Sequence, residues 1–502
     1  MSLPHIRNIV IVGGGTAGWM TAAGLAKVLT GNWTIRLVES EEIGTVGVGE
    51  ATIPLINIYN KALGIDEDEF MRATNGTFKL GIEFCNWGKL GGSYMHGFGN
   101  LGPDIGITKF HQYWLKAQQE GYAMDIENYS ICSLAARHAK FMRARPELGN
   151  SPLSEIAHAF HFDANLYAAF LRKYAEQRGV IRIEGKVSGA TTRPADGFIE
   201  AIVMDNGERI EGDLFIDCSG FRGLLIEQTL HAGYDDWSHW LPCDRAWAVP
   251  CESVAPLLPY TRSTARDAGW QWRIPLQSRI GNGHVYSSKF TDDASAVDIL
   301  MNNLDGQALA EPRQLKFVTG KRKKFWDKNC VAIGLSSGFM EPLESTSIHL
   351  IQSTIARLTT FFPDQGFDQC NIDEFNRQAN FEVEKIRDFL ILHYKATSRT
   401  DTEFWNYCRN MDIPDSLRNK MALYESNGRV FREASEMFSE ISWFEVMHGQ
   451  GLKPRSYHPL VDALAEGKIR TFLENVSSTT LRCVEAMPTH ADFVRDNCAA
   501  RT

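Results

Sequence analysis

A glycine-rich segment near the start of the chain has the pattern of a dinucleotide-binding loop. Gly13, Gly15 and Gly18 form G-x-G-x-x-G between a short apolar run and a run of small residues. The first glycine permits a tight turn, the second lets the backbone approach a pyrophosphate, and the third lets a helix pack on a strand. The start of that helix also offers free N–H groups to an anion. Glu39 ends the next apolar run, 21 residues beyond Gly18, where an acid can accept hydrogen bonds from ribose hydroxyls. The segment therefore predicts binding of FAD or NAD.

Two later segments extend this predicted nucleotide-binding fold. Segments 212–220 and 330–334 are both apolar runs that end in glycine. This layout resembles FAD monooxygenase-type flavoproteins, in which widely separated segments close over an extended FAD. Those hydroxylases usually carry an acid after the glycine of the third segment, whereas Gly334 is followed here by Leu335. The missing acid counts against a simple aromatic hydroxylase.

Alternating strand and helix patterns place the first 390 residues in the α/β class. We expect 1–390 to form an FAD-binding domain of the FAD-monooxygenase or glutathione-reductase type, with a helical insertion at about 105–145. A helix is expected at 163–178, with Asp163 as its N-cap. Farther along, the pattern becomes helical without clear strands, so 391–502 is predicted to be a helical substrate-binding domain.

The composition excludes several other classes of protein. Of the 502 residues, 44% are hydrophobic and 23% are charged, as in globular proteins rather than disordered chains or coiled coils. The net charge of −9, without a long basic block, gives no electrostatic footprint for nucleic acid. No apolar run reaches the ~18 residues of a membrane span, and the first residues lack a signal pattern. The 10 cysteines are scattered without a C-x-x-C pair, so we expect reduced thiols, no metal site and a cytoplasmic protein.

Four further motifs lie outside the glycine-ended segments. They are Gly-Val-Gly-Glu-Ala-Thr-Ile-Pro at 47–54, Phe-Lys-Leu-Gly-Ile-Glu-Phe at 78–84, Trp-Gln-Trp-Arg-Ile-Pro at 270–275 and Glu-Pro-Leu-Glu-Ser-Thr-Ser at 341–347. Together they resemble the flavin-dependent tryptophan and indole halogenases over nearly the whole chain. The resemblance implies that reduced FAD from a separate NADH-dependent flavin reductase, oxygen and chloride or bromide give hypohalous acid, which halogenates an indole-type ring. Members of the family often pair, so a homodimer is also an expectation.

The resemblance gives Lys79 the central catalytic role. In 78–84 apolar residues alternate with others, which puts Lys79 on the face opposite the apolar set. For an arbitrary lysine this pattern indicates a solvated strand face. In the family this lysine guides the electrophile, either by hydrogen-bonding hypohalous acid or by becoming a haloamine. Partial desolvation lowers the pKa of a lysine and suits the second route, and the sequence does not choose between them.

The motif at 341–347 supplies the other reacting groups under the resemblance. Glu344 is expected near Lys79, where it orients the electrophile and helps to remove the ring proton. The plainer interpretation of Glu344, which is compatible with the catalytic role, is a first-turn helix carboxylate stabilised by the helix dipole. The backbone amides of Thr346 and Ser347 are expected to hold the halide. Serine at the second of these positions departs from the glycine that is common in the family.

Other residues receive roles from their places in the family's segments. Trp270 and Trp272 are expected to form a wall that keeps the substrate away from the flavin, and core packing is the plain alternative. The expected substrate contacts are His96, Phe98, Trp443 and Phe444. The expected FAD contacts are Gly13, Gly15, Thr16, Ala17, Gly18, Glu39, Ala51, Val187, Gly334 and Leu335.

The C-terminal part lacks the amino-acid anchor that a tryptophan substrate requires. Tryptophan-specific members hold the ammonium and carboxylate with polar groups that typically include an adjacent tyrosine pair, and this chain has no Tyr-Tyr pair. The region 441–451 is more apolar and aromatic, with Glu445 as an alternative ammonium partner. A zwitterion in such a site loses hydration that it cannot replace. We therefore expect a neutral indole, or a larger indole-containing molecule, to react faster than free tryptophan, at C3.

Two other functions compete with an indole halogenase. A flavin-dependent aromatic hydroxylase shares the oxygen chemistry, but it turns over without chloride or bromide. A flavin-binding protein that acts only through a partner needs no reacting groups, so Lys79, Glu344 and the tryptophan motif argue against it.

Overall fold

The computed structural model describes residues 5–42, 49–433 and 435–500. Its first layer is a six-stranded sheet in the order β20-β21-β12-β1-β2-β8. The strands are β1 (Asn8–Val12), β2 (Thr34–Glu39), β8 (Ile181–Glu184), β12 (Leu214–Asp217), β20 (Trp326–Asp327) and β21 (Cys330–Ala332). All neighbours pair in parallel except β20 and β21. The three apolar runs that were expected to belong to one nucleotide-binding fold lie side by side in this sheet as β1, β12 and β21.

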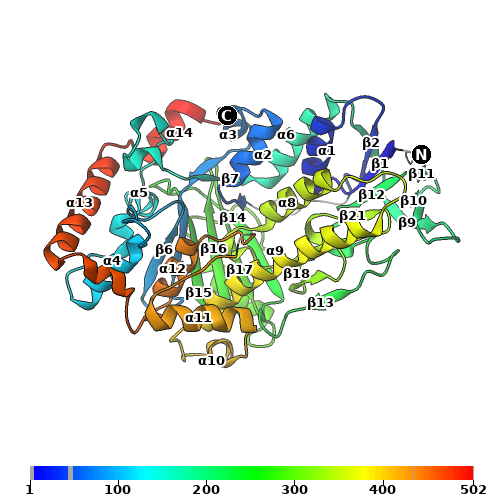
Figure 1. Cartoon of the computed structure of the whole chain (residues 1–502). Coiled ribbons are helices and arrows are strands. Elements are labelled where there is room, and N and C mark those ends of the chain that lie inside the picture. Colours follow the sequence, from blue (N-terminus) through cyan, green and yellow to red (C-terminus); the bar gives the residue numbers. More distant parts are fainter. Residues whose placement is uncertain (1–4, 43–48, 434, 501–502) are drawn as a thin grey trace.

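A group of helices lies beside this sheet; the first contacts β1 and β2, and the others pack on it or on one another (Figure 1). They are α1 (Thr16–Val28), α2 (Ile56–Leu63), α3 (Glu67–Ala73), α6 (Ala164–Glu176) and α8 (Ser347–Thr360). Small residues on α1 let it contact both α6 and α8. The side chain of Asp163 accepts hydrogen bonds from the backbone N–H groups at the start of α6, so the predicted cap is confirmed.

A seven-stranded sheet forms the second layer, in the order β18-β14-β17-β16-β15-β5-β6. Its strands are β5 (Gly81–Cys85), β6 (Ser93–Gly97), β14 (Arg245–Cys251), β15 (Thr261–Arg266), β16 (Gly269–Pro275), β17 (Ile280–Tyr286) and β18 (Arg313–Lys316). Neighbours are antiparallel except β15 and β5. The tryptophan motif lies on β16 at the centre of this sheet, and His96 lies on the edge strand β6.

A short helix, α7 (Asp293–Met301), packs on β17 of the second layer. The remaining strands form three small sheets of three strands each. Their strands are β3 (Gly49–Ala51), β4 (Thr77–Lys79) and β7 (Ala159–Asp163); β9 (Val187–Thr192), β10 (Ile199–Met204) and β11 (Arg209–Glu211); and β13 (Tyr234–Asp236), β19 (Gly320–Arg322) and β22 (Gly338–Phe339). In the first of them β7 pairs with both β3 and β4, so the motif at 47–54 and Lys79 share one sheet. Gly47 and Val48 of that motif lie outside the described residues.

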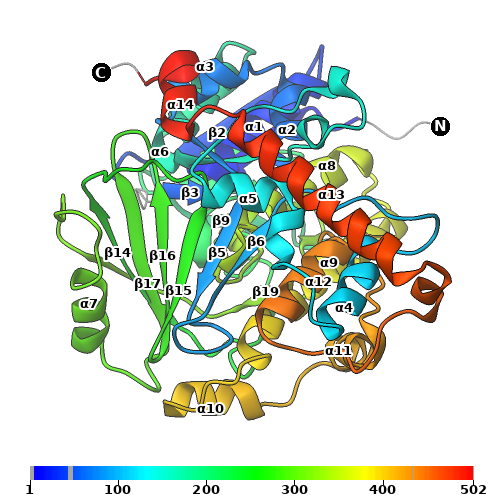
Figure 2. The ribbon, with the colours of Figure 1, turned by 90° about the vertical axis from the view of Figure 1, so that its left-hand side faces the viewer.

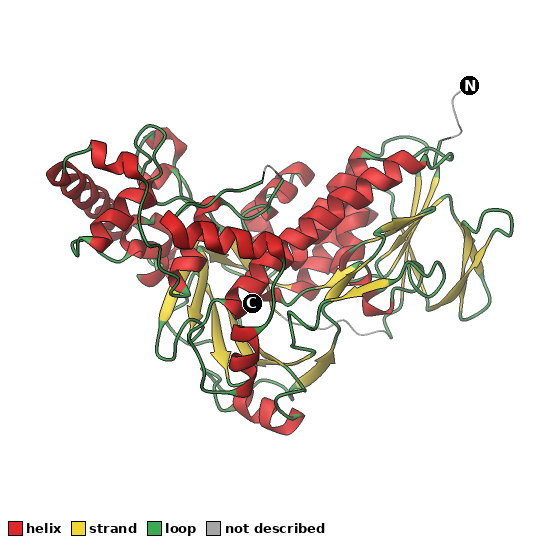
Figure 3. Cartoon of the chain, turned by 60° about the horizontal axis from the view of Figure 1, so that its bottom comes forward, coloured by secondary structure: helices red, strands yellow, loops and turns green. Residues whose placement is uncertain are grey.

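Helices account for the C-terminal part and for the expected insertion. They are α4 (Phe110–Gln119), α5 (Ile131–Arg137), α9 (Gln369–Lys395), α10 (Glu403–Asn410), α11 (Asp415–Asn427), α12 (Glu440–Gly449), α13 (Glu466–Glu485) and α14 (His490–Cys498). Figure 2 shows α13 crossing beside α4 and α5, which it contacts. Helices gather at the end of the molecule away from the N-terminus (Figure 3), while α9 also reaches back to β20 of the first sheet. The last helix, α14, returns to α3.

Residue 390, where we expect one domain to end, lies inside α9. The first half of α9 contacts β20 and α8, and its second half contacts α10, α11 and α12. One continuous cluster of buried apolar side chains extends through both parts. The division at 390 therefore stays a prediction about function, because the two parts share a helix and a core.

Candidate active site

The glycine loop lies between β1 and α1 and is too tightly packed for side chains at two of its glycines. Gly13 has φ +115°, and a Cβ there would lie 2.3 Å from the carbonyl oxygen of Cys218. A Cβ at Gly18 would lie 1.8 Å from the carbonyl oxygen of Gly13, so only glycine lets α1 approach the strand. At Gly15 a Cβ would meet no described atom within 4 Å. The loop is thus tightly packed against protein backbone at Gly13 and Gly18, whereas Gly15 faces open space.

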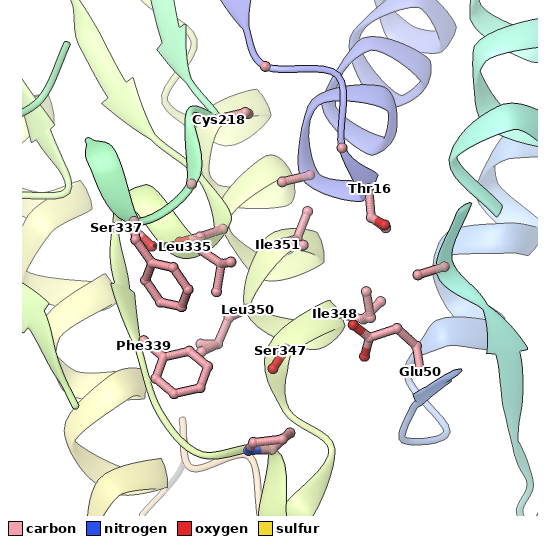
Figure 4. A pocket seen from close by; sticks show the side chains of 18 of the residues that line it. Thr16, Glu50, Cys218, Leu335, Ser337, Phe339, Ser347, Ile348, Leu350 and Ile351 are labelled. Atoms are coloured by element: carbon pink, nitrogen blue, oxygen red, sulfur yellow. Dashed lines mark hydrogen bonds between the residues drawn. The ribbon is translucent and has the colours of Figure 1, made fainter. Parts of the chain in front are cut away.

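This open side faces a cavity of about 510 Å³. The predicted FAD contacts that line it are Gly13, Gly15, Thr16, Ala17, Glu39, Ala51, Val187, Gly334 and Leu335. Gly18 is the exception, because it packs on Gly13 instead. Figure 4 shows Thr16 of α1, Glu50 of β3 and Ser347 of α8 around the same space. A glycine cradle that opens into a cavity between separated segments fits an extended dinucleotide such as FAD.

The glycine loop gives a prediction that separates folding from binding. Gly13→Ala should destabilise the protein by about 1–3 kcal/mol, because its Cβ meets backbone and its φ is unfavourable. Gly15→Ala should leave the melting temperature unchanged but weaken FAD binding roughly tenfold or more, about 1.4 kcal/mol, because its Cβ enters the cavity. Thermal melting and fluorescence titration with FAD measure the two effects. Equal FAD affinity in Gly15→Ala and the parent would contradict this placement of the cofactor.

Lys79 ends β4 and is fully buried, with 0% exposure. Its Nζ donates hydrogen bonds to the carbonyl oxygen of Thr52 at 3.0 Å and to Oγ of Ser345 at 2.8 Å, and it lies 5.3 Å from the ring centroid of Phe98. Burial lowers the pKa of Lys79 to about 7, although the Glu344 carboxylate opposes the shift. The alternative of a solvated strand face is therefore wrong, because both faces of β4 are covered: Phe78 stacks on Phe141 on one side, and Lys79 lies over Phe98 on the other.

Glu344 lies in a 3-10 turn, Pro342–Glu344, and not in the first turn of α8. The alternative of a helix-start carboxylate is therefore wrong. Its Oε1 and Oε2 lie 3.1 and 3.0 Å from Nδ1 of His96, and Oε1 lies 2.9 Å from Nε2 of His393. Burial alone would raise the pKa of Glu344, but the two histidines outweigh this effect and hold the pKa at about 2. The site thus holds an ionised, buried carboxylate.

Two residues of this cluster escaped the sequence analysis. Ser345 sits between Glu344 and Thr346 with φ +59°, a left-handed conformation that is unusual for serine. Its position inside a recognised motif was the available signal, and its hydroxyl accepts a hydrogen bond from Lys79. His393 had no such signal, because only the packing of α9 against the seven-stranded sheet brings it to Glu344.

The four expected substrate contacts do not gather in one place. His96 and Phe98 lie in the cluster, since His96 contacts Glu344 and Phe98 lies under Lys79. Trp443 of α12 lies one ring farther away, edge-on to Phe389 at 4.8 Å. Phe444 packs in the core between α12 and α4, with its ring stacked 4.6 Å from that of His111. Neighbours on a helix point in different directions, so Trp443 and Phe444 do not form one wall.

The expected wall and halide residues all line the cavity. Trp270 is held in place because its Nε1 donates to Oε2 of Glu341 at 2.7 Å, and Trp272 packs on Gly283. Thr346 and Ser347 begin α8, a 14-residue helix whose start has no side-chain cap among the described residues. Free N–H groups at such a start favour an anion. The cavity and Lys79 are therefore separated by the short segment around Ser345.

The described part of the chain contains no cluster of side chains suited to a metal ion. No set of three or more His, Cys, Asp or Glu residues within 5–42, 49–433 and 435–500 has the geometry of a metal site. All ten cysteines are free thiols. No described helix combines the length and apolar character needed to cross a membrane.

Comparisons with known proteins match this geometry. The family model for tryptophan halogenase matches residues 8–466. Tryptophan 6-halogenase ThaL of Streptomyces albogriseolus is 34% identical over 98% of both chains. Among solved structures, Xcc4156, a flavin-dependent halogenase from Xanthomonas campestris, is 50% identical over 99% of both chains with a TM-score of 0.96. BrvH, a flavin-dependent halogenase from Brevundimonas sp. BAL3, is 46% identical with a TM-score of 0.95, over 98% of this chain and 100% of that one.

Proposed function

This chain belongs to the tryptophan halogenase family and is a flavin-dependent halogenase, and from that premise we propose that Lys79 guides hypohalous acid to an indole-type substrate. The observation that supports the proposal is the pair of hydrogen bonds made by Nζ of Lys79. Thr52 directly follows β3 and Ser345 directly precedes the start of α8, and both segments border the cavity. The lysine is thus fixed to the cavity's wall while it faces Phe98 on the other side.

Each part of the site then has one role. The glycine loop, Glu39 and the segments at Val187 and Gly334 hold FAD, which supplies the electrons for the activation of oxygen when a separate NADH-dependent reductase has reduced it. The amides that begin α8 hold the halide, and Trp270 and Trp272 separate the flavin from the substrate. Hypohalous acid reaches Nζ of Lys79, which presents the halogen to the ring. Glu344 then accepts the ring proton.

The proposal is tested by mass spectrometry of indole incubated with the protein, a flavin reductase, FAD, NADH and bromide. We expect a product with the bromine isotope pattern, and no product when the halogenase is omitted. A hydroxylated product that forms equally well without halide would instead support the competing hydroxylase.

The expected substrate preference has its own test. Burial raises the pKa of Glu445 to about 8, so this carboxyl is mostly neutral at pH 7 and is a poor partner for an ammonium group. We therefore expect equimolar indole and tryptophan to give mainly 3-haloindole. The reason is that the zwitterion loses several kcal/mol of hydration in an apolar site, whereas neutral indole loses little. Preferential conversion of tryptophan, at one benzo position, would contradict this preference.

A further inference from the structure

His393 is a fully buried histidine of α9 to which the proposed mechanism assigns no role. Its Nδ1 lies 2.8 Å from the carbonyl oxygen of Phe389, one helical turn earlier. A carbonyl oxygen only accepts hydrogen bonds, so Nδ1 must carry a proton. The state of Nε2 therefore decides whether the ring is neutral or a cation.

Nε2 of His393 faces the carboxylate of Glu344. It lies 2.9 Å from Oε1, an ion-pair distance without the alignment of a hydrogen bond. Without a proton on Nε2, its lone pair would face those of a buried carboxylate, and the contact would be repulsive. With a proton there, the contact becomes an attraction between imidazolium and carboxylate. The pair therefore requires one proton that a neutral histidine and an ionised carboxylate do not supply.

Among the residues that the structure describes, Glu344 is the one ion-pair partner of His393. Its ring packs against Phe84 and Trp87 at centroid distances of 4.8 and 6.0 Å, and against Phe389 at 5.3 Å. The titratable groups around the Glu344–His393 pair are Lys79 on β4, Tyr94 and His96 on β6, and Glu445 on α12. The positive charge of an imidazolium at this buried position is therefore compensated by the negative charge of Glu344, the carboxylate that His393 contacts.

Three other buried carboxyls of the same chain show what burial does without such a partner. Burial raises the pKa of Glu50 and of Glu341 to about 7, and that of Glu445 to about 8. None of the three accepts a hydrogen bond from a cationic side chain of the described residues, and Glu341 accepts its hydrogen bonds from Trp270 and Tyr394. Glu344 differs from all three in having two histidines against its oxygens.

We propose that His393 is an imidazolium in the resting protein, and that it is a positioning residue that, together with His96, keeps Glu344 ionised whatever the charge of Lys79. The role in catalysis rests on the proposed function, while the protonation state does not. Lys79 titrates near neutral pH, so it is an unreliable counter-ion for Glu344. His393, which belongs to α9, supplies a positive charge next to Oε1 of Glu344 that does not depend on the charge of Lys79.

This assignment fixes the path of the ring proton. The C–H bond at the halogenated carbon breaks, its electron pair returns to the ring, and the proton passes to an oxygen of Glu344. His393 already carries protons on both nitrogens, so it does not accept this proton. Its charge instead lowers the free energy of the carboxylate that does.

Neutron diffraction from deuterium-exchanged crystals of the full chain at pH 8 tests the protonation state directly and requires no turnover. We expect deuterium on both nitrogens of His393 and none on Glu344. His284 is a control in the same crystal, because its Nδ1 also lies 2.9 Å from a backbone carbonyl, that of Ala296, and it is also fully buried. Its Nε2 has no hydrogen-bond partner among the described residues, and burial lowers its pKa to about 4. Deuterium on Nδ1 alone in both histidines, or on Glu344 instead of Nε2, would overturn the proposal.

The proposed role of His393 in catalysis is tested by measuring the halogenation rates of His393→Gln and of the parent protein across pH. The ratio of the two rates removes the pH dependence that Lys79 gives to both proteins. Glutamine keeps a neutral donor but removes the charge, so the pKa of Glu344 should rise toward those of the other buried carboxyls. We expect the ratio to be roughly tenfold lower at pH 6 than at pH 9. The control His284→Gln should give a flat ratio. A flat ratio for His393→Gln as well would reduce His393 to a packing residue, and absence of halogenation by the parent would refute the proposed function instead.

Discussion

Lys79→Ala should abolish halogenation while FAD binding and NADH consumption by the coupled reductase continue. The expected loss is roughly 10²–10⁴-fold or more, because the methyl group cannot donate a hydrogen bond to hypohalous acid or accept its halogen. Lys79 does not line the cavity of the predicted FAD contacts, so its removal should leave the cofactor's site intact. Product formation by liquid chromatography and mass spectrometry, beside the FAD titration, measures both quantities.

Two matched variants control for the folding of Lys79→Ala. Lys79→Met keeps the volume of the buried side chain without its charge and should be equally inactive. Lys116 of α4 is another largely buried lysine, paired with Asp462 at 2.6 Å, and Lys116→Ala should stay active. Substantial product from a folded Lys79→Ala or Lys79→Met protein would show that the lysine does not guide the electrophile.

The two routes proposed for Lys79 have opposite dependence on pH. Because the pKa of Lys79 is lowered to about 7, both its forms are populated near neutral pH. Hydrogen-bond donation to hypohalous acid uses the ammonium form, so that rate should fall as pH rises through 7. Haloamine formation uses the free amine, so that rate should rise over the same range. The pH profile of single-turnover halogenation distinguishes them.

The nucleotide-binding half of the fold could be predicted because its signals are local. Gly18 is required by its contact with the backbone of Gly13, only five residues away, and the apolar runs become β1, β12 and β21. The helix cap at Asp163 is equally local, since the side chain bonds the N–H groups two and three residues on. Turns and helix caps depend on the backbone conformation of a few neighbouring residues, so the residue types in a short segment are enough to predict them.

The cluster around Lys79 depends on long-range packing and could be predicted only in part. The alternation around Lys79 indicated an exposed face, but this face of β4 is also buried, with Lys79 lying over the ring of Phe98. His393 reaches Glu344 through the course of α9, about fifty residues along the chain, and no periodicity indicates such a contact. Phe444 was grouped with Trp443 by sequence proximity, whereas α12 directs the two rings to different neighbours.

Glu344→Gln should lower the halogenation rate roughly 10–10³-fold, the scale of losing one electrostatic or general-base contribution. The amide keeps the shape of the carboxyl group, but it cannot accept the ring proton, and it leaves His96 and His393 facing a neutral group. The reaction's positively charged ring intermediate then loses the ionised oxygen that the two histidines hold in place. Single-turnover product formation at pH 7, with FAD affinity measured in parallel, gives the size of the effect.

Glu382 of α9 is the matched control, because it is also a largely buried carboxylate clamped by a histidine. Its Oε1 lies 2.8 Å from Nε2 of His349, and its Oε2 accepts from Arg357 at 2.7 Å. Burial alone would raise the pKa of Glu382, but His349 and Arg357 hold it at about 2, as the histidines do for Glu344. Glu382→Gln should therefore lower the melting temperature by a comparable amount, because each substitution removes a carboxylate charge from such a clamp. It should leave the rate per folded molecule unchanged, because Glu382 does not contact the Lys79 cluster. Unchanged turnover in Glu344→Gln, or an equal loss in Glu382→Gln, would mean that Glu344 stabilises the fold and takes no part in removing the ring proton.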